Sequence, residues 1–389
     1  MDCDVIIVGG GPVGASLALA LCAARLRVAL IEAHAPRRLK KEAGWDSRIY
    51  ALSPGSAAFL ERLGVWPRLD AARVQRIEDM RVFGDDAASE LDFSAYESGL
   101  RELAFILENR ELQRALWEAL RDEPGIECIA PAACAALAIT SQAVELTLAD
   151  GRTVRARLIV GADGADSWVR AQARIETVMH SYHQRAVVAN FSTAKSHHDT
   201  ACQWFRRDGV LALLPLPGER VSMVWSTTEE HAAHLLALKP ETLAAAVAAA
   251  SHEALGELKT ITKAAAFPLR LERARQFVAP RIALAGDAAH SVHPLAGQGV
   301  NLGLRDAREL AQVLAQRGPQ KDCGDFYLLR RYERARREDV LATQFATDTL
   351  HRLFNRDPRD RFAGVRNFGL RLVNRGTPLK NLLTRHAVE

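Results

Sequence analysis

Short apolar runs flank a longer apolar stretch at the start of the chain. The first run spans Asp4 to Val8, the longer stretch spans Pro12 to Ala24, and a second short run spans Arg27 to Glu32. Glycines separate the first run from the stretch that follows it. Buried strands on either side of a helix have this pattern, so it predicts a strand–helix–strand unit and an α/β fold.

The same kind of junction recurs twice further along the chain. Strand-to-helix junctions marked by glycine are predicted near Gly9, Gly161 and Gly286. Apolar runs from Val144 to Leu148 and from Thr153 to Val160 flank Asp150-Gly151, which predicts a hairpin that feeds the second junction. Because long segments of different character separate the junctions, we expect one domain assembled from discontinuous pieces.

The segment between the second and third junctions has a different pattern. Strand-like runs are predicted over Arg185 to Phe191, Gly209 to Leu214, Arg220 to Ser226 and Ala265 to Leu271. An alanine-rich helix is predicted from Glu241 to Ala250. These elements predict a second domain built on a mostly antiparallel sheet.

The end of the chain is predicted to be helical and basic from Tyr327 onward. Its first turns carry Arg330, Arg331, Arg334, Arg336 and Arg337. From His351 to the last residue, nine Lys or Arg face three Asp or Glu and are interleaved with Phe and Leu. We favour a helix pair that packs on the first domain with a solvated basic face over a surface that docks to a membrane or a partner.

Composition and charge argue against several classes of protein. A chain of 389 residues is long enough for two or three domains, and its formal charge of +4 is too small to argue for nucleic acid. The six cysteines have no C-x-x-C spacing, so no metal site or redox dithiol is predicted and a reducing compartment is favoured. The start lacks the features of a signal peptide, and no stretch approaches the ~20 apolar residues of a membrane span. We therefore expect a cytoplasmic protein, with any contact to the inner face of the cytoplasmic membrane being peripheral.

The first junction carries the pattern of a dinucleotide site. Gly9-Gly10-Gly11-Pro12-Val13-Gly14 fits G-x-G-x-x-G between a strand and a helix. In this pattern the first glycine makes the turn, the second lets a pyrophosphate approach, and the third lets helix and strand pack closely. Glu32 ends the next strand, where a carboxylate accepts hydrogen bonds from ribose hydroxyls. The order of these signals favours dinucleotide binding over a simple tight turn, although it does not distinguish FAD from NAD.

The other two junctions add acidic residues and a second helix start. Asp287 follows the third predicted strand and is placed to bond a polyol such as a ribityl chain, while the amides from Gly297 to Asn301 can face the N1–C2=O edge of a flavin. Asp163 is expected beside a basic group or a hydrated pyrophosphate, and the alternative of a helix cap with a surface ion pair is equally favoured for this segment alone.

The three segments resemble the fingerprints of the FAD-dependent aromatic monooxygenases of the para-hydroxybenzoate hydroxylase type, in that family's order. Within it, the chain is similar to the ubiquinone-biosynthesis hydroxylases in Asp46-Ser-Arg-Ile-Tyr-Ala-Leu-Ser53, in Glu108-Asn-Arg-Glu-Leu-Gln-Arg-Ala-Leu-Trp117, in Leu211-Ala-Leu-Leu-Pro-Leu-Pro217 and near Leu353-Phe354 and Arg366-Asn367. The resemblance implies that Arg48 lies near the flavin and pyrophosphate, and that Gln113, with Asn109 as a further candidate, comes from a helix that supports the cofactor. Pattern and resemblance together assign cofactor binding to Gly9, Gly11, Pro12, Val13, Gly14, Glu32, Ala33, Arg48, Asn109, Gln113, Asp163, Gly286, Asp287, Pro294, Gly297, Gly299, Val300 and Asn301.

The resemblance also implies a fold and its division. It implies a Rossmann-like FAD-binding domain of the para-hydroxybenzoate hydroxylase type, an inserted and mostly antiparallel β-sheet substrate domain, and a C-terminal helical segment. The FAD-binding domain is expected over 1–72, 108–180 and 275–340, the substrate domain over 73–107 and 181–274, and the helical segment over 341–389.

The activity implied by the resemblance is hydroxylation of the ring of a polyprenylated phenol by molecular oxygen through a flavin C4a-hydroperoxide. Electrons would come from NAD(P)H bound transiently or from a partner reductase, and other quinone-biosynthesis proteins are candidate partners. No catalytic side chain is assigned, because packed or capping roles are favoured for His290 and His293, and Tyr50 is no stronger a candidate. A flavin-dependent prenyl-chain reductase and a catalytically silent FAD-binding scaffold remain as alternatives. A disulfide reductase is excluded by the lack of a cysteine pair near the first helix, and a halogenase by the lack of W-x-W-x-I-P.

Overall fold

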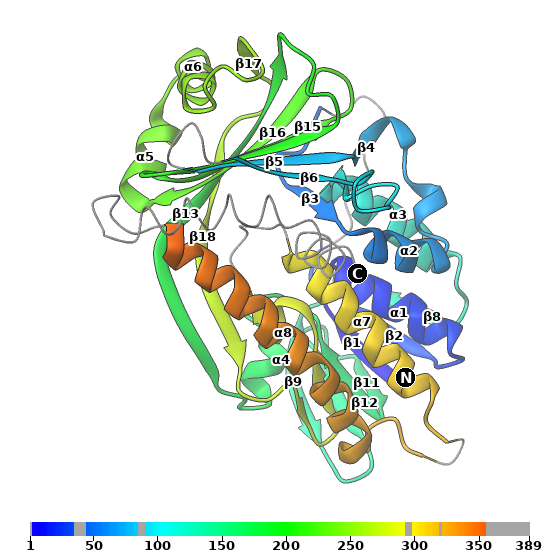
Figure 1. Ribbon diagram of the computed structural model, residues 1–389. Coiled ribbons are helices and arrows are strands. Elements are labelled where there is room, and N and C mark those ends of the chain that lie inside the picture. The colour runs from blue at the N-terminus through cyan, green and yellow to red at the C-terminus, as the bar shows by residue number, and fades with distance from the viewer. Residues whose placement is uncertain (1, 35–43, 85–89, 292–297, 319–320, 355–389) are drawn as a thin grey trace.

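The computed structural model describes residues 2–34, 44–84, 90–291, 298–318 and 321–354, the last ten of these by their backbone alone. Two large β-sheets dominate the described chain, and helices pack against both of them (Figure 1). A smaller sheet lies where the two halves meet.

The first large sheet contains the three predicted junctions. Its strands are β1 (Val5–Val8), β2 (Val28–Ile31), β8 (Ile126–Ile129), β12 (Leu158–Gly161), β19 (Val278–Ala279) and β20 (Ile282–Leu284). They are ordered β19-β20-β12-β1-β2-β8, with every neighbouring pair parallel except β19 and β20. β1, β2, β12 and β20 are buried at each position, as expected for parallel strands covered on both faces. The predicted α/β fold is confirmed.

Helices cover this sheet and begin or end close to its strands. They are α1 (Pro12–Ala23), α3 (Asn109–Arg121), α4 (Trp168–Gln172), α7 (Gly299–Ala315) and α8 (Phe326–Phe354). α1 packs against both α3 and α7, and α8 packs against α7 (Figure 1).

The hairpin around Gly151 differs from its prediction in one respect. β10 (Val144–Leu148) pairs with β11 (Thr153–Ala156) and with β9 (Cys134–Ile139) in a three-stranded antiparallel sheet. The prediction of one continuous strand from Thr153 to Val160 was wrong. The chain leaves this sheet at Arg157 and enters the parallel sheet as β12. Alternating burial in β11 gives way to continuous burial in β12, since one strand has a solvated face and the other has none.

The second large sheet has nine strands and confirms the predicted antiparallel sheet. Its strands are β5 (Asp79–Phe83), β6 (Glu90–Ser94), β13 (Thr177–Thr193), β14 (Thr200–Arg206), β15 (Gly209–Leu216), β16 (Arg220–Thr228), β17 (Leu258–Thr260), β18 (Ala265–Ala274) and β21 (His290–Ser291). Among the described strands of this sheet, only β5 and β14 pair in parallel. α5 (Glu229–Ala237) and α6 (Pro240–Ala250) cover one face, over a core that includes Phe191, Met223 and Trp225.

A small sheet that the sequence patterns did not predict joins the two halves. It consists of β3 (Ile49–Leu52), β7 (Ala104–Glu108) and β4 (Val74–Ile77), and α2 (Pro54–Arg62) follows β3. Ile77 and Ile106 from this sheet form one apolar cluster with Ala201 and Leu216 from the large antiparallel sheet. β7 therefore pairs with both β3 and β4. In contrast, β5 and β6, from the same predicted segment 73–107, join the antiparallel sheet. The residue-level domain boundaries stay a prediction.

The C-terminal described segment is the single helix α8, and the rest of the predicted helix pair falls outside the described residues. Tyr332 is fully buried, and its hydroxyl donates to the Leu284 carbonyl of β20 at 2.8 Å. Arg331, Arg334 and Arg337 are exposed as predicted, but Arg336 is buried, so the basic face is not wholly solvated. No helix in the described part of the chain is long and apolar enough to cross a membrane.

Candidate cofactor site

The three junctions meet at one edge of the parallel sheet. Val8 at the end of β1 is in register with Gly161 at the end of β12, which is in register with Leu284 at the end of β20. Backbone hydrogen bonds continue past the strands, from Ala162 N to Val8 O at 2.8 Å and from Ala285 N to Gly161 O at 2.9 Å. Segments more than 120 residues apart in sequence are thus neighbours, as a shared binding site requires.

The three glycines of the G-x-G-x-x-G pattern have different surroundings, and these explain what each glycine does in the turn. Gly9 has φ +106°, and a Cβ there would lie 2.3 Å from the Ala162 carbonyl oxygen. A Cβ on Gly14 would lie 1.9 Å from the Gly9 oxygen, so only glycine lets α1 lie this close to the turn. Gly11 has open space around its Cβ position. These are the turn, the close packing and the open approach expected of the G-x-G-x-x-G pattern.

The start of α1 is suited to binding a phosphate. Gly11 is the N-cap residue and Pro12 occupies the first helical position, and no side chain caps the helix. The first N–H groups of a helix have no partner within it and carry partial positive charge, so they attract an anion. Val13, in the same turn, packs against the third junction, because Cβ atoms on Gly286 and Gly303 would lie 3.1 and 2.5 Å from its Cγ2 atom.

Glu32 reaches the same turn from the end of β2. Its Oε2 atom accepts from Gly10 N at 2.6 Å and its Oε1 atom from His34 N at 3.0 Å. The side chain is half-buried and Ala33 beside it is exposed, so the carboxylate still has acceptor capacity toward solvent. This is the location expected of a carboxylate that receives ribose hydroxyls, and that role stays a prediction.

Asp287 in the third turn is accessible and yet desolvated. Its residue is exposed, while the density of protein atoms around it raises the pKa of its carboxyl, an effect that His290 and Arg48 oppose. Solvent reaches this residue, so a ligand can contact it. Gly286 before it has φ +60°, a conformation that glycine adopts without strain.

Arg48, Tyr50 and Asn109 come together beside Asp287. The Tyr50 hydroxyl donates to Asn109 Oδ1 at 3.0 Å, and the Arg48 guanidinium lies 5.7 Å from the centre of the Tyr50 ring. Burial raises the pKa of Tyr50; Arg48 lowers it and Asp287 raises it, so the three groups interact electrostatically. Asn109 N also donates to the Arg48 carbonyl at 2.9 Å. Arg48 is exposed, which leaves its guanidinium free to meet a ligand from the solvent side.

α3 supplies a stripe of side chains that connects the first and third turns. Asn109, Gln113 and Trp117 are four residues apart and therefore lie on one helix face. Asn109 reaches Tyr50 at one end, and at the other Trp117 Nε1 donates to the Gly10 carbonyl at 3.0 Å. Gln113 is half-buried between them. The predicted supporting role of α3 agrees with this arrangement.

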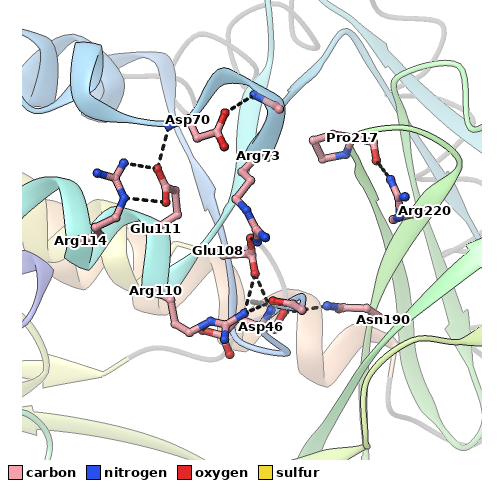
Figure 2. Close-up of polar contacts among 12 residues, drawn as sticks. Asp46, Asp70, Arg73, Glu108, Arg110, Glu111, Arg114, Asn190, Pro217 and Arg220 are labelled. Carbon is pink, nitrogen blue, oxygen red and sulfur yellow. Dashed lines mark hydrogen bonds and ion pairs between the residues drawn. The ribbon is translucent and has the colours of Figure 1, made fainter. Parts of the chain in front are cut away.

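A buried carboxylate holds the segment before β3 (Figure 2). Glu108, 1 % exposed, accepts from Asp46 N at 2.5 Å and pairs with the guanidinium groups of Arg73 and Arg110. Asn190 of β13 donates its Nδ2 hydrogen to the Asp46 carbonyl at 2.7 Å. The antiparallel sheet is thereby tied to the segment that leads into Arg48 and Tyr50.

Replacing Glu108 by glutamine is expected to lower the free energy of unfolding by about 3 kcal/mol, because two arginines lose their buried counter-charge. Urea unfolding at neutral pH measures the effect. Glu118→Gln is the matched control: Glu118 pairs with Arg114 on the same helix, its side chain is 39 % exposed, and a change within about 0.5 kcal/mol is expected. Equal losses in the two variants would show that the Glu108 cluster does not anchor the segment.

Asp163 in the second turn has local partners. It accepts from the Ser167 hydroxyl at 2.6 Å and from Val169 N at 3.1 Å. Ser167 is the N-cap residue of α4, so Asp163 supports the cap from the preceding turn, and neither of these two partners is a basic group. A contact between Asp163 and a pyrophosphate stays a prediction. Arg170 turns elsewhere, to Glu272 at 2.8 Å and to the Ala288 carbonyl at 3.0 Å. It links the second turn to the third through the backbone beside Asp287.

The start of α7 forms the remaining part of the site. Gly299 and Val300 are half-buried in its first turn, and among the described residues no side chain, that of the N-cap residue Gln298 included, caps this helix. The Asn301 side chain is buried and bonds the backbone where β3 leads into α2. Its Oδ1 atom accepts from Ser53 N and its Nδ2 atom donates to Ala51 O, both at 2.9 Å. Its side chain thus ties the first turn of α7 to the end of β3 and the residue after it. Pro294, Gly297 and His293 lie outside the described residues.

Sequence patterns missed a buried charged group behind the third turn. Asp306 of α7 is fully buried and accepts from Gly286 N at 2.8 Å, from His290 at 2.7 Å and from Arg336 at 2.6 Å. His290 is thereby a packed residue, the role favoured from the sequence. The available signal was an aspartate within the apolar stripe of α7, since Asp306 is four residues from both Leu302 and Leu310.

These groups fit a flavin dinucleotide. The open side of Gly11 and the uncapped start of α1 suit a pyrophosphate, the Glu32 carboxylate suits a ribose, and the accessible Asp287 carboxylate suits a polyol. A second uncapped helix, α7, begins beside the third turn and suits a group that becomes negative on reduction.

Comparisons with known proteins agree with this geometry. The family model described as FAD binding domain matches residues 2–345. The chain is 39 % identical over 387 residues to ubiquinone hydroxylase UbiL of Rhodospirillum rubrum, covering 99 % of this chain and 89 % of that protein. It is 35 % identical over 387 residues to the 3-demethoxyubiquinol 3-hydroxylase of Escherichia coli, covering 99 % and 98 %. The solved structure of PqsL, a probable FAD-dependent monooxygenase from Pseudomonas aeruginosa, superposes with a TM-score of 0.78 at 26 % identity, covering 94 % of this chain and 99 % of that one. The chain therefore belongs to the FAD-binding domain family and has the fold of the FAD-dependent aromatic monooxygenases of the para-hydroxybenzoate hydroxylase type.

Proposed function

We propose that this protein uses FAD and molecular oxygen to hydroxylate the aromatic ring of a polyprenylated phenol in ubiquinone biosynthesis. The observation that carries the proposal is the convergence of three distant glycine-containing turns, with Asp287, Glu32 and the open side of Gly11, at one sheet edge. The names of the relatives, two of which are ubiquinone-pathway hydroxylases, favour this substrate class over others.

In this proposal the pyrophosphate of FAD is held by the first turn of α1, from Gly11 to Gly14, while Glu32 receives ribose hydroxyls. Asp287 binds the ribityl chain, and Arg48 approaches the cofactor from the solvent side. Arginine suits that role because its charge persists at any physiological pH and its planar head can bond two oxygens at once.

Reduced flavin supplies the oxygen activation, and the chain supplies binding, orientation and charge stabilisation. Amides in the first turn of α7, at Gly299 and Val300, would stabilise negative charge on the N1–C2=O edge of the ring system. The antiparallel sheet would hold the phenol ring against the flavin and keep water away. This chemistry asks for no protein acid or base, which agrees with the packed role of His290.

We further propose that NAD(P)H donates the electrons and that membrane contact is peripheral. A prenylated substrate partitions into the membrane, and the basic, apolar sequence after His351 has the composition of a segment that contacts an anionic surface. Other proteins of quinone biosynthesis are the candidate partners.

The decisive experiment supplies the purified flavoprotein with NAD(P)H, ¹⁸O₂ and a short-chain prenylated phenol. One ¹⁸O atom is expected per product ring, with NAD(P)H consumption that depends on the phenol. Flavin reoxidation at the same rate with and without phenol would instead identify a silent scaffold. Loss of a double bond in the tail without oxygen uptake would identify a prenyl-chain reductase. Expression in cells lacking single quinone hydroxylases then identifies the ring position, from the intermediate that disappears.

A further inference from the structure

A single buried carboxylate ties together the two ends of the turn that carries Asp287. Asp306 Oδ2 accepts from Gly286 N at 2.8 Å and from His290 Nε2 at 2.7 Å. An ionised carboxylate can only accept, so the histidine nitrogen is the donor. Because Gly286 and His290 bracket Asp287, these two hydrogen bonds fix where the Asp287 side chain emerges.

The other oxygen of this carboxylate faces helix α8. Arg336 Nε donates to Asp306 Oδ1 at 2.6 Å, and Arg336 Nη2 donates to the Leu302 carbonyl at 3.4 Å. Arg336 Nη1 pairs with Asp339 at 2.5 Å, which in turn pairs with Arg305 of α7 at 3.0 Å. Figure 1 shows α8 in orange beside α7 in yellow, the two helices that this network joins.

Asp306, His290 and Arg336 are all buried. Asp306 is 0 % exposed, His290 2 % and Arg336 5 %. Burial would raise the pKa of Asp306, but His290 and Arg336 outweigh it and lower the pKa below its usual value. The carboxylate therefore stays ionised at neutral pH and keeps both of its contacts.

The buried ion pair of Asp306 and Arg336 is not explained by its contribution to the stability of the fold. Desolvating an aspartate and an arginine costs several kcal/mol, and well-packed apolar residues of similar volume stabilise a fold as well or better. A directional hydrogen bond from its N–H to a carboxylate, in contrast, fixes the backbone of Gly286, whose φ of +60° belongs to a turn. Orientation of the turn is the property that an apolar replacement could not supply.

We propose that Asp306 and Arg336 are positioning residues that hold the Asp287 turn in its FAD-binding conformation, so that α8 takes part in cofactor binding although it does not touch the cofactor. The inference rests on the assignment of Asp287 to FAD under the proposed function. It adds a dependence of FAD affinity on a residue of the C-terminal helix.

The test compares Arg336→Gln and Arg336→Lys with Arg337→Gln, which changes the exposed neighbouring arginine. The dissociation constant for FAD is measured on each apoprotein by quenching of flavin fluorescence, at a temperature well below the melting temperature of every variant. Arg336→Gln is expected to raise the constant roughly 10-fold, within the range usual for coupling between sites. Arg336→Lys should recover part of the affinity because it keeps the charge, and Arg337→Gln should leave the constant unchanged.

A purely structural role predicts a different outcome. Arg336→Gln would then lower the melting temperature of the apoprotein while its FAD dissociation constant stayed within about threefold of the unmodified protein's. That result would overturn the proposal. Asp306→Asn supplies the second arm: if it folds, its effect on the dissociation constant should not add to that of Arg336→Gln, because both act through one contact. All of these measurements omit the phenol, so a protein that binds FAD but hydroxylates nothing would refute the proposed function and leave this inference standing.

Discussion

Gly14→Ala is expected to abolish FAD retention and to destabilise the apoprotein by about 3 kcal/mol. The new Cβ would lie 1.9 Å from the Gly9 carbonyl oxygen and 3.2 Å from the Ala162 side chain. Both nearest groups belong to the junction turns, and one of them is backbone, so α1 itself must move away from the sheet. Its first-turn amides would then no longer face the pyrophosphate. Urea unfolding of the apoprotein and flavin content after gel filtration measure the two losses.

Gly11→Ala is the matched variant, three residues earlier in the same pattern. Gly11 has φ −69° and ψ −179°, which alanine adopts without strain, and its Cβ would meet no atom within 4 Å. Stability of the apoprotein should therefore be unchanged or up to about 1 kcal/mol higher, because the unfolded chain loses freedom. FAD affinity should still fall on the order of 100-fold, since the methyl group occupies the approach of a charged pyrophosphate. Unimpaired FAD binding by this variant would mean that the phosphate lies elsewhere.

Asp287→Ala is expected to weaken FAD binding roughly 10- to 100-fold while leaving the apoprotein no less stable. The affinity loss follows from removing a charged acceptor, worth about 1.5–3 kcal/mol per hydrogen bond. Stability should not suffer, because burial raises the pKa of this carboxyl and its ionised form is therefore disfavoured in the folded chain. Isothermal titration of the apoprotein with FAD gives the affinity. Asp287→Asn keeps one acceptor oxygen, so its FAD affinity should fall between those of the unmodified protein and Asp287→Ala.

The raised pKa also gives the Asp287 prediction a pH dependence. Below the ordinary carboxyl pKa of 3.8 the group is protonated in both the folded and the unfolded chain, so its removal changes nothing. As pH rises past 3.8 the unfolded chain loses its proton first, so the folded chain is destabilised by an amount that grows until its own carboxyl is ionised and stays constant above that pH. Any gain in melting temperature of the Asp287→Ala apoprotein should thus be largest near pH 7 and vanish in acid. A gain that grew as pH fell would show that the carboxylate is stabilised in the folded state.

Local patterns were sufficient where function depends on neighbouring residues in the chain. The roles of Gly9 and Gly14 were predictable because a strand, a tight turn and a helix in succession leave no room for side chains at those positions. The location of Glu32 beside the first turn was predictable for the same reason, since it directly follows the next strand. The antiparallel sheet was also predictable, although its edge strands β5 and β6 and the small sheet of β3, β4 and β7 were not.

Two features that the sequence did not predict depend on contacts between distant residues. Arg336 belongs to a run of arginines that was expected to be exposed on a helix. It is buried because its guanidinium donates to the buried Asp306. The Asn301 side chain bonds the backbone of β3, about 250 residues earlier. Neither partner can be read from the segment that contains the residue, because a polar side chain has the same sequence pattern whether it faces water, a ligand or another part of the fold.

The amino-acid sequence was enough to predict an α/β flavoprotein, its three turns and most of the residues placed near them, because glycine patterns and strand-to-helix junctions are properties of short segments. Tertiary structure alone revealed that β12 lies between β1 and β20, that Glu108 anchors the segment before β3, and that α8 reaches the Asp287 turn through Arg336. Strand order and buried ion pairs depend on which surfaces pack together, and packing is decided by the whole chain.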